Sequence, residues 1–498
     1  MTDADKPSLK SPDPVAAHPT VSSTVEREIK LSVDDRFRLP KLPGTAIPRR
    51  LLISTYFDTS RYDLAHAGIT LRHRVERGKQ AWQLKLPLMN NRQEVELVDR
   101  RPLPPALFRD LLLLHLGQRE LVPVATLRVW RAGVHVHIDR ATVADVTLDQ
   151  VSVMKDGAVL QRFRELEIEQ VNGKDRALPD LEQQLRRAGA EDHDGHPKLF
   201  RALSLAVPGH GSQPEPDAPA LDHVRWALAR HARWLCAHDP GVRLGREPES
   251  LHQMRVATRK LRTVLRAAMP LLIPEWVNSL RDELRWLGEL LGPARDLDVQ
   301  LAYFREESAE LDARDRRTLT PFIAHLETQR NNAQDILLSK LKGPRYLDLI
   351  RLLREAPNDP TAIESTATLH DLAKQEFRKL QKVIHQAGDR PNNANIHRIR
   401  INTKRARYAA ELAESTVGKS ATRFIDKTRA VQDLLGLHQD ALKAEAYIQA
   451  FLKRSTNVRA AFVAGRMAER QHRRREKAKE KMKRLLNSLL KRGEKAWE

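Results

Sequence analysis

Hydrophobic and polar residues alternate one by one in several short segments of the first 200 residues, as they do in β-strands with one buried face. The clearest segments are LRHRVE (71–76), AWQLKL (81–86), RQEVELV (92–98), VHVHID (134–139), DVTLD (145–149) and FRELEIEQV (163–171). Turn-forming residues separate several of them, which is typical of an antiparallel sheet or barrel. Helical spacing of apolar residues predicts helices at 105–116 and 180–190.

The pattern changes at residues 206–222, a stretch dense in proline and glycine without any hydrophobic period. Such a composition is typical of a linker, which we place at 206–220. Beyond it the apolar residues follow the helical period. We therefore predict a disordered tail at 1–21, a strand-rich domain at 22–205 and an all-helical domain at 221–495.

The helical part repeats itself. LHQMRVATRKLRTVL (251–265) resembles IHRIRINTKRARYAA (396–410), and LRWLGELLGPARD (284–296) resembles TRAVQDLLGLHQD (428–440). The two copies lie 145 residues apart for the first motif and 144 for the second. This nearly constant offset indicates a duplicated unit, with copies at about 221–355 and 365–495. We expect two similar helical bundles.

The polar faces of the predicted strands are almost entirely charged. Residues at alternate positions share a face in each of the following sets: Glu26, Glu28 and Lys30; Arg72 and Arg74; Gln83 and Lys85; Arg92, Glu94 and Glu96; Glu165, Glu167 and Glu169. For any single strand a solvent-exposed face is the favoured interpretation. Like charges at i and i+2 nevertheless repel unless something neutralises them. A closed barrel with a polar lumen and helices over its apolar outside explains the whole set.

A lumen of this kind suits phosphate chemistry. Carboxylate oxygens are the ligands that Mg²⁺ or Mn²⁺ prefers, and basic side chains bind phosphate oxygens. A divalent cation together with a cage of basic groups is typical of phosphoryl transfer.

The motifs resemble the CYTH family, the triphosphate tunnel metalloenzymes. The family's ExExK motif matches Glu26, Glu28 and Lys30, and the rest follow in family order: YFDT (56–59), LRHR (71–74), LKLP (84–87), RQEVE (92–96), LDQ (148–150), ELEIE (165–169) and PKLF (197–200). The resemblance covers about residues 22–205. It implies an α+β domain whose eight-stranded antiparallel tunnel binds a triphosphate with a divalent metal. One departure is Val151, where relatives often carry glycine.

The resemblance also implies roles for individual residues. The implied metal ligands are Glu26, Glu28, Asp149, Glu165 and Glu167, and the implied triphosphate-binding residues are Lys30, Arg72, Arg74, Lys85, Arg92, Arg128, Arg131 and Lys198. We expect Glu26, Glu28, Lys30 and Lys85 to serve catalysis. Arg128 and Arg131 would point to opposite faces of an uninterrupted strand, and the alternation selects Arg131 unless a bulge intervenes.

Histidine, arginine and lysine residues form a basic stripe along one helix in each copy of the repeat. The stripes are His252, Arg255, Arg259, Arg262 and Arg266 in the first copy, and His397, Arg400, Lys404 and Arg407 in the second. A basic stripe on a solvated face usually has acidic partners at i+4. On the interpretation that both stripes lack such partners, a polyanion site is favoured over a solvated face.

This half of the chain, about 220–495, resembles the CHAD family, named for conserved histidines in an α-helical domain. The match includes RDLD (295–298) after the second helical motif. The resemblance implies two four-helix bundles and a basic surface that binds polyphosphate through His252, Arg255, Arg259, Arg262, His397, Arg400, Lys404 and Arg407. CYTH followed by CHAD in one chain is a known arrangement. For the basic segment 470–486, a binding role and a solvated helix end remain equally open.

The net charge of +21 lies mostly in the second half of the chain. Residues 1–210 carry 32 basic and 28 acidic residues, whereas residues 211–498 carry 54 and 37. This excess indicates a polyanionic partner, for which nucleic acid, an acidic membrane surface and inorganic polyphosphate are the alternatives. Aromatic residues make up only 5%, which disfavours nucleic acid because stacking platforms are lacking.

The composition also bounds the cellular context. No run approaches the ~18 apolar residues of a membrane-spanning helix, so we expect no membrane association. The single cysteine, Cys236, excludes an internal disulfide and a cysteine-built zinc site. Both observations fit a cytoplasmic protein, with association with polyphosphate granules as an open alternative.

Taken together, the residues and the two resemblances predict a divalent-metal-dependent inorganic triphosphatase. It would hydrolyse tripolyphosphate in the tunnel and bind long-chain polyphosphate on the helical domain. Two alternatives remain open: a non-catalytic polyphosphate-binding or granule-associated protein, and a nucleotide-directed tunnel enzyme such as an adenylyl cyclase or nucleoside triphosphatase.

Overall fold

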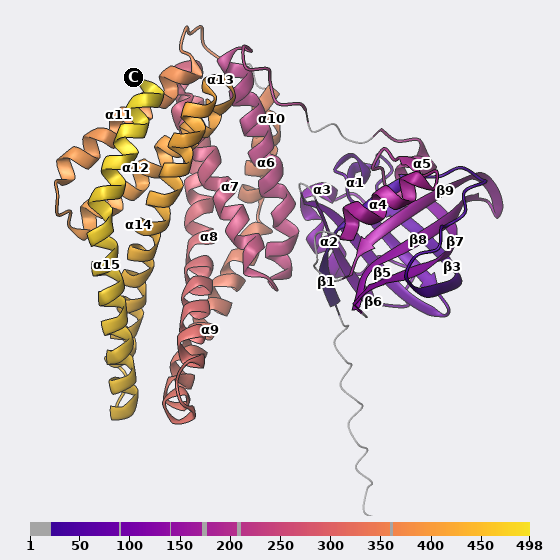
Figure 1. Ribbon diagram of the computed structural model, residues 1–498, viewed down its shortest axis with the longest axis horizontal. Coiled ribbons are helices and arrows are strands. Elements are labelled where there is room, and N and C mark those ends of the chain that lie inside the picture. The colour runs from indigo at the N-terminus through magenta and orange to yellow at the C-terminus, as the bar shows by residue number, and fades with distance from the viewer. Residues whose placement is uncertain (1–20, 89–90, 140, 172–176, 207–210, 359–361) are drawn as a thin grey trace, which may run out of the picture. The chain divides into compact units, whose positions relative to one another are not determined.

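The computed structural model describes residues 21–88, 91–139, 141–171, 177–206, 211–358 and 362–498. The chain divides into two compact units, Met1–Gly209 and His210–Glu498, and Figure 1 draws the first largely as strands and the second as helices. The predicted tail lies outside the described residues except for Val21. The same holds for residues 207–210 of the predicted linker.

In its described residues the first unit is built on one antiparallel sheet of ten strands. The strands are β1 (Val21–Glu26), β2 (Glu28–Ser32), β3 (Gly44–Asp58), β4 (Thr70–Glu76), β5 (Lys79–Leu88), β6 (Asn91–Val98), β7 (Val122–Ile138), β8 (Ala141–Lys155), β9 (Ala158–Gln170) and β10 (Glu191–Asp192). Their order across the sheet is β1-β6-β5-β4-β3-β7-β8-β9-β2-β10. Five short helices accompany the sheet: α1 (Asp63–His66), α2 (Ala106–Leu111), α3 (Leu113–Leu116), α4 (Ala177–Arg187) and α5 (Lys198–Leu203).

The count of ten rather than eight has a local cause. β1 pairs with β6 and β2 pairs with β9, although only Arg27 separates the two segments along the chain. The predicted strand that carries Glu26, Glu28 and Lys30 is therefore interrupted at Arg27, and its two halves pair at opposite ends of the sheet order. The two-residue β10 adds a further strand beside β2.

The alternation of side chains gives the sheet two different faces. On one face, Leu31, Val146, Leu166 and Ile168 form a buried core with residues of α4 such as Leu185. On the other face of β8, Asp149 is fully buried. Further along this second face the residues become apolar and pack against α5, in a core that includes Leu127, Val129, Val151, Val153, Leu199 and Phe200. The charged residues therefore lie on the face that α5 covers at one end.

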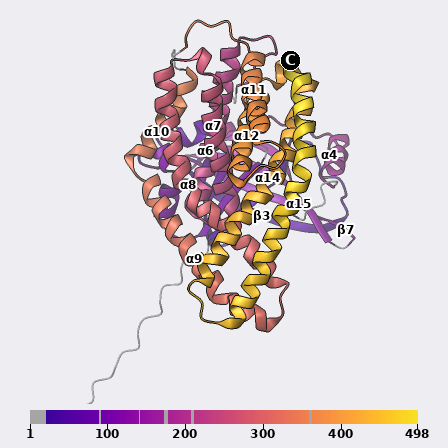
Figure 2. The same cartoon turned by 90° about the vertical axis from the view of Figure 1, so that its left-hand side faces the viewer.

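The second unit is all helical. Its α-helices are α6 (Ala220–Leu244), α7 (Pro248–Ala267), α8 (Pro274–Ala309), α9 (Ala313–Leu341), α10 (Pro344–Glu355), α11 (Leu369–Ala387), α12 (Asn393–Leu412), α13 (Glu414–Val417), α14 (Lys419–Leu452) and α15 (Val458–Trp497). The first repeat motif occupies α7 in one copy and α12 in the other, and the second occupies α8 and α14. Figure 2 shows the long helices of this unit running alongside one another.

Apolar stripes hold these helices together. One core joins α8, α9, α14 and α15 through residues such as Phe304, Phe322, Ile448 and Met467. At the end of α15, Trp497 is fully buried and packs edge-on against Phe424. Among the described residues no helix combines the length and apolar character needed to cross a membrane.

Candidate functional site

Three carboxylates and three cations form one ion-pair cluster on the charged face of the sheet. Arg131 of β7 binds both oxygens of Asp149 on β8, at 2.8 and 2.7 Å, and its Nη2 lies 2.6 Å from Glu167 Oε2 on β9. Lys198, the first residue of α5, lies 2.6 Å from Glu167, 3.0 Å from Asp149 and 3.2 Å from Glu165. Lys30 of β2 lies 2.7 Å from Glu165 and also pairs with Glu167. The members of the cluster that belong to strands all lie on one face of the sheet, as alternation predicts. For β7 the sequence had left Arg128 and Arg131 as alternatives, and the structure places Arg131 in the cluster.

The cluster is buried, so its charges depend on one another. Burial opposes ionisation of Glu165, but the ammonium groups of Lys198 and Lys30 outweigh it and lower the pKa of that carboxyl to about 2. The pKa of Glu167 is also lowered well below its ordinary value, because Lys198, Lys30 and Arg131 outweigh its burial. Conversely, these carboxylates raise the pKa of Lys198 well above normal despite its burial. Both glutamates and the lysine are therefore ionised at neutral pH.

Four other predicted basic residues, Arg72, Arg74, Lys85 and Arg92, have looser contacts on the charged face of the sheet. Arg72 donates to Gln83 at 2.8 Å and to Tyr56 at 3.2 Å, while Arg74 pairs with Glu76. Lys85 lies 3.0 Å from Glu94, and Arg92 lies 3.8 Å from Glu28. The last contact joins β6 to β2, which are near opposite ends of the sheet order. The sheet must therefore curve strongly for these two side chains to meet.

Two predicted residues need separate comment. The side chain of Glu26 lies outside the described part of the chain; its backbone pairs with Arg92 at the end of β1. Arg128 is not brought to the cluster. No register shift separates it from Arg131 in the pairing of β7 with β8, so the two side chains point to opposite faces of the strand. That Arg128 binds substrate therefore stays a prediction, which its position outside the cluster does not support.

His193 joins the cluster, and the sequence analysis missed it. The ring is almost fully buried, and its Nδ1 accepts a hydrogen bond from Gly195 N at 2.9 Å. Nδ1 also lies 3.2 Å from Asp194 Oδ1, and Nε2 lies 3.7 Å from Glu165 Oε2. The residue follows β10 in a loop without strand or helix periodicity, so no sequence pattern pointed to it.

A divalent cation fits one feature of this cluster. Glu165 Oε2 is buried and has no hydrogen-bond partner, and an unpartnered carboxylate oxygen is the donor that Mg²⁺ or Mn²⁺ prefers. Glu28 is half-buried nearby, 3.7 Å from Lys30. Among the described residues, however, no group of three or more acidic, histidine or cysteine side chains is arranged to hold a metal, because the cations lie between them.

The helical unit contains a second charged site, formed by both copies of the repeat. Arg255 and Arg259 of α7 face Arg400 and Lys404 of α12; we call these four residues the central cluster. Arg255 lies 3.0 Å from Asp296 of α8, whose other oxygen is 2.6 Å from Lys443 of α14. Asp440 of α14 is the other carboxylate that faces the cluster. Cations thus outnumber the carboxylates that face them.

Burial and the excess of positive charge both lower the pKa of Lys404. Burial, together with the positive charges of Arg259, Arg400 and Arg255, lowers the pKa of Lys404 to about 6. The same combination of burial and like charge lowers the pKa of Arg259. The Nε atoms of Arg259 and Arg400 are buried without hydrogen-bond partners. A bound anion would satisfy these donors and relieve the repulsion.

The ends of the two stripes are less uniform than predicted. His252 is half-buried beside Arg295, and His397 lies on the surface, 3.3 Å from Gln439. Arg407 pairs with Glu411 at i+4 over 2.8 Å, so the interpretation that both stripes lack such partners is wrong for this residue. Arg262 has no ion-pair or hydrogen-bond partner among the described residues.

Comparison with known proteins agrees with the division into two units. The model of the CYTH domain family matches residues 24–199, and that of the CHAD domain family matches residues 227–449. Uncharacterized protein Rv2226 of Mycobacterium tuberculosis is 29% identical over 510 residues, which is 92% of this chain and 94% of that protein.

Solved structures are similar to part of the chain. The CHAD domain of the plant Ricinus communis is 26% identical and covers 55% of this chain and 94% of its own, with a TM-score of 0.46. The Hippeastrum protein HpAC1, described as having a dominant triphosphatase activity, is 18% identical and covers 37% and 98%, with a TM-score of 0.25.

Proposed function

Because the chain consists of a CYTH domain followed by a CHAD domain, we propose that it is a metal-dependent inorganic triphosphatase with a polyphosphate-binding module. The observation that carries the proposal is the buried cluster of Lys30, Lys198 and Arg131 with Asp149, Glu165 and Glu167. Such a mixture of cations and carboxylates suits a substrate that is itself a chain of anions carrying divalent cations.

We propose further that the sheet closes into a tunnel around this cluster. The support is that β1 and β2 pair at opposite ends of the sheet order although a single residue joins them. The contact between Arg92 of β6 and Glu28 of β2 spans the same seam. The apolar core around α5 would then fill one end of the tunnel, so that substrate enters from the other.

Binding would proceed by exchange of partners. A triphosphate would take the guanidinium of Arg131 and the ammonium groups of Lys30 and Lys198 onto its oxygens. Arg72, Arg74, Lys85 and Arg92 would hold the rest of the chain. The carboxylates of Glu28, Glu165 and Glu167 would then be released to hold Mg²⁺ or Mn²⁺, with Asp149 and Glu26 as further candidates. When bound, the cation supplies neutralisation of phosphate charge and a more acidic water.

The protein's own residues would contribute position and charge. The basic residues would fix the terminal phosphate in line with an incoming water and stabilise the charge that develops on the leaving pyrophosphate. Glu165, ionised through its pKa of about 2, would remain available as an anion throughout the neutral range. The side chains of the cluster are charged rather than aromatic, so they suit phosphates better than a nucleoside base. We therefore favour inorganic tripolyphosphate over a nucleotide.

The helical unit would bind longer polyphosphate at the central cluster. We propose that the two repeat copies form two related four-helix bundles whose basic stripes meet there. The support is that Arg255 and Arg400, and likewise Arg259 and Lys404, are each separated by the 145-residue offset of the repeat. A linear polyanion suits such a site because it can contact equivalent cations from both copies at once.

A substrate panel tests the proposed reaction. Phosphate release would be measured from tripolyphosphate, ATP, thiamine triphosphate and long-chain polyphosphate, each with Mg²⁺, Mn²⁺ or EDTA. We expect tripolyphosphate with a divalent cation to be hydrolysed fastest. Glu28→Ala should abolish that hydrolysis, whereas Glu182→Ala on the surface of α4 should not. No turnover by the wild-type protein with any metal would favour the non-catalytic alternative, and preference for ATP would favour the nucleotide-directed one.

A further inference from the structure

Two faces flank the central cluster, and the repeat offset relates them. Lys260 and Arg405, Arg407 and Arg262, Glu411 and Arg266, and His231 and Glu376 are each separated by 145 residues. The first residue of each pair lies on one face and the second on the other. A duplicated unit would have begun with equal faces, so any difference in charge between them arose after the duplication.

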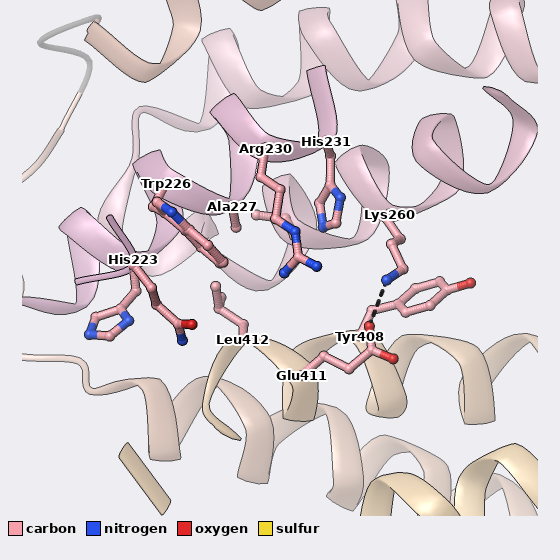
Figure 3. A pocket seen from close by; sticks show the side chains of 11 residues that line it. His223, Trp226, Ala227, Arg230, His231, Lys260, Tyr408, Glu411 and Leu412 are labelled. Atoms are coloured by element: carbon pink, nitrogen blue, oxygen red, sulfur yellow. Dashed lines mark ion pairs between the residues drawn. The ribbon is translucent and has the colours of Figure 1, made fainter. Parts of the chain in front are cut away.

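On the first face two cations share one carboxylate. We call it the paired face: Lys260 of α7, Arg407 and Glu411 of α12, and His231 of α6. Glu411 lies 3.0 Å from Lys260 and 2.8 Å from Arg407. Figure 3 shows the Lys260–Glu411 pair among the side chains that line a small pocket. Arg230 points into the same pocket, where its guanidinium stacks on Trp226 at 5.1 Å. Burial lowers the pKa of His231 to about 3, so its ring is neutral.

The second face carries arginine where the first has its glutamate. We call it the arginine face; it consists of Arg262, Arg266, Arg281, Arg285 and Arg405. Within the described residues, neither Arg262 nor Arg405 has an ion-pair or hydrogen-bond partner, and Arg281 Nε is buried without one. Arg266 reaches Glu376 only at 3.5 Å, and Lys379 already binds that carboxylate at 2.7 Å.

The guanidinium groups of this face lie close enough to repel one another. Burial and the charges of Arg266, Arg281 and Arg262 lower the pKa of Arg405. Burial and the charges of Arg285 and Arg281 lower that of Arg262, and the nearby carboxylates of Glu289 and Asp282 only partly oppose this shift. Asp282 already pairs with Arg285 at 3.2 Å. The unfavourable arrangement would be relieved by an anion, as in the central cluster. Arg262 follows Arg259 by one turn of α7, so the two sites adjoin along the same helix.

We propose that the arginine face is a second phosphate subsite, which binds the continuation of an inorganic polyphosphate chain held by the central cluster. The inference rests on the proposed function of that cluster. From Arg255 to Arg266 the stripe rises about 16 Å along α7, which is longer than an extended triphosphate. A long polyphosphate chain can therefore contact both sites at once, whereas tripolyphosphate can occupy only one. The domain thus binds longer chains more tightly. The chain leaves on this side because Lys260 and Arg407 of the paired face already bind Glu411.

Competition binding with the full chain in EDTA tests the proposal. Labelled long-chain polyphosphate is the probe, and unlabelled long-chain polyphosphate and tripolyphosphate are the competitors. The double variant Arg262→Gln/Arg405→Gln should weaken long-chain binding roughly tenfold or more, because it removes two charged contacts to phosphate. Tripolyphosphate should compete for the central cluster as well as before. The matched control is Arg230→Gln/Lys260→Gln, which changes Lys260 of the paired face and Arg230 of the pocket beside it. It also removes two positive charges and should change long-chain affinity less than about twofold.

A third variant separates this inference from the function on which it rests. Arg255→Gln/Lys404→Gln removes charge from the central cluster and should weaken both competitors. If that variant binds normally, the proposed polyphosphate site itself is wrong. If it loses binding while the arginine-face variant matches wild type, only the second subsite is overturned. A larger loss in the paired-face control would place the chain on the opposite side and overturn the proposal. Thermal melting of each variant checks that the helices remain folded.

Discussion

At the scale of single residues, both charged sites contain groups whose ionisation is set by their neighbours. In the sheet unit, cations and carboxylates neutralise one another, and Glu165 keeps its charge although it is fully buried. In the helical unit, positive charges outnumber the carboxylates that face them among the described residues. Lys404 is the cation whose pKa is lowered to about 6, so it is neutral above that pH. On the function proposed here, the first site exchanges its partners for a metal and an anion, whereas the second binds an anion alone.

Lys404 predicts proton uptake on binding. It faces Arg259 and Arg255 of α7, Arg400 of its own helix and Asp440 of α14, and its pKa of about 6 leaves it neutral at pH 8. A bound polyanion raises that pKa toward the ordinary 10.5, so binding at pH 8 should take up about one proton at this residue. The affinity for polyphosphate should therefore rise as the pH falls from 9 to 6 and level off below pH 6. Protonation of the phosphates acts in the opposite direction and is subtracted from this change.

Calorimetry in buffers of different ionisation enthalpy measures this uptake. Lys404→Arg is the matched control, because arginine stays protonated throughout this range and its uptake should be absent. Equal uptake in the two proteins would assign the proton to another group.

His193 is expected to orient Glu165. Its Nε2 is aimed at Glu165 Oε2 from 3.7 Å, and a residue that orients a metal ligand typically affects metal affinity by 10–100-fold. His193→Phe should raise the Mn²⁺ concentration needed for half-maximal hydrolysis by about that factor. His193→Gln keeps an N–H donor near the same position and should restore most of the affinity. A phenylalanine variant with unchanged metal dependence would show that His193 only fills space.

At the scale of secondary-structure elements, the charged strands and the repeat could be predicted from the sequence. The contacts between elements distant in sequence could not. Alternation correctly grouped Glu165 with Glu167, and the repeat motifs fall on α7, α8, α12 and α14. It did not reveal β3, because PRRLLISTYFD runs apolar residues together without clear alternation. The predicted helix at 105–116 is divided into α2 and α3 at Leu112.

The remaining failures concern contacts between distant segments. The facing of Arg259 and Lys404 depends on how α7 packs against α12, which no local pattern specifies. The pairing of Arg407 with Glu411 was present in the sequence and was overlooked. The ion-pair partners of Lys198 could not be predicted from the sequence either, because the fold of the whole sheet determines where α5 lies.

The packing of α15 on α11 supplies a test of the helical architecture. A Cβ added at Gly493 would lie 1.9 Å from the ring of Phe377, so Gly493→Ala forces that buried ring to move. We expect it to lower the free energy of unfolding by about 1–3 kcal/mol, measured as the loss of helical signal in urea. Gly465→Ala, on the same helix with nothing within 4 Å, should instead be neutral or stabilising by about 0.5–1 kcal/mol. Equal stability of the two variants would contradict this packing.

At the scale of the whole molecule, we propose that the sheet unit hydrolyses tripolyphosphate and the helical unit binds long-chain polyphosphate. Glu28→Ala should abolish hydrolysis of tripolyphosphate and leave long-chain binding unchanged. Arg255→Gln/Lys404→Gln should do the reverse, because its substitutions lie in the helical unit. Phosphate release and competition binding on the same preparations measure both properties. If one variant lost both, the two units would not act separately.

The central claim is that the ion-pair cluster of the sheet exchanges its partners for a triphosphate and a divalent cation. A crystal structure of the full chain with tripolyphosphate and Mn²⁺, with the metal located by its anomalous scattering, tests it most directly. The account predicts phosphate oxygens on Lys30, Lys198 and Arg131, and manganese on carboxylates from among Glu28, Glu165 and Glu167. Tripolyphosphate bound only elsewhere, with those ion pairs intact, would contradict it.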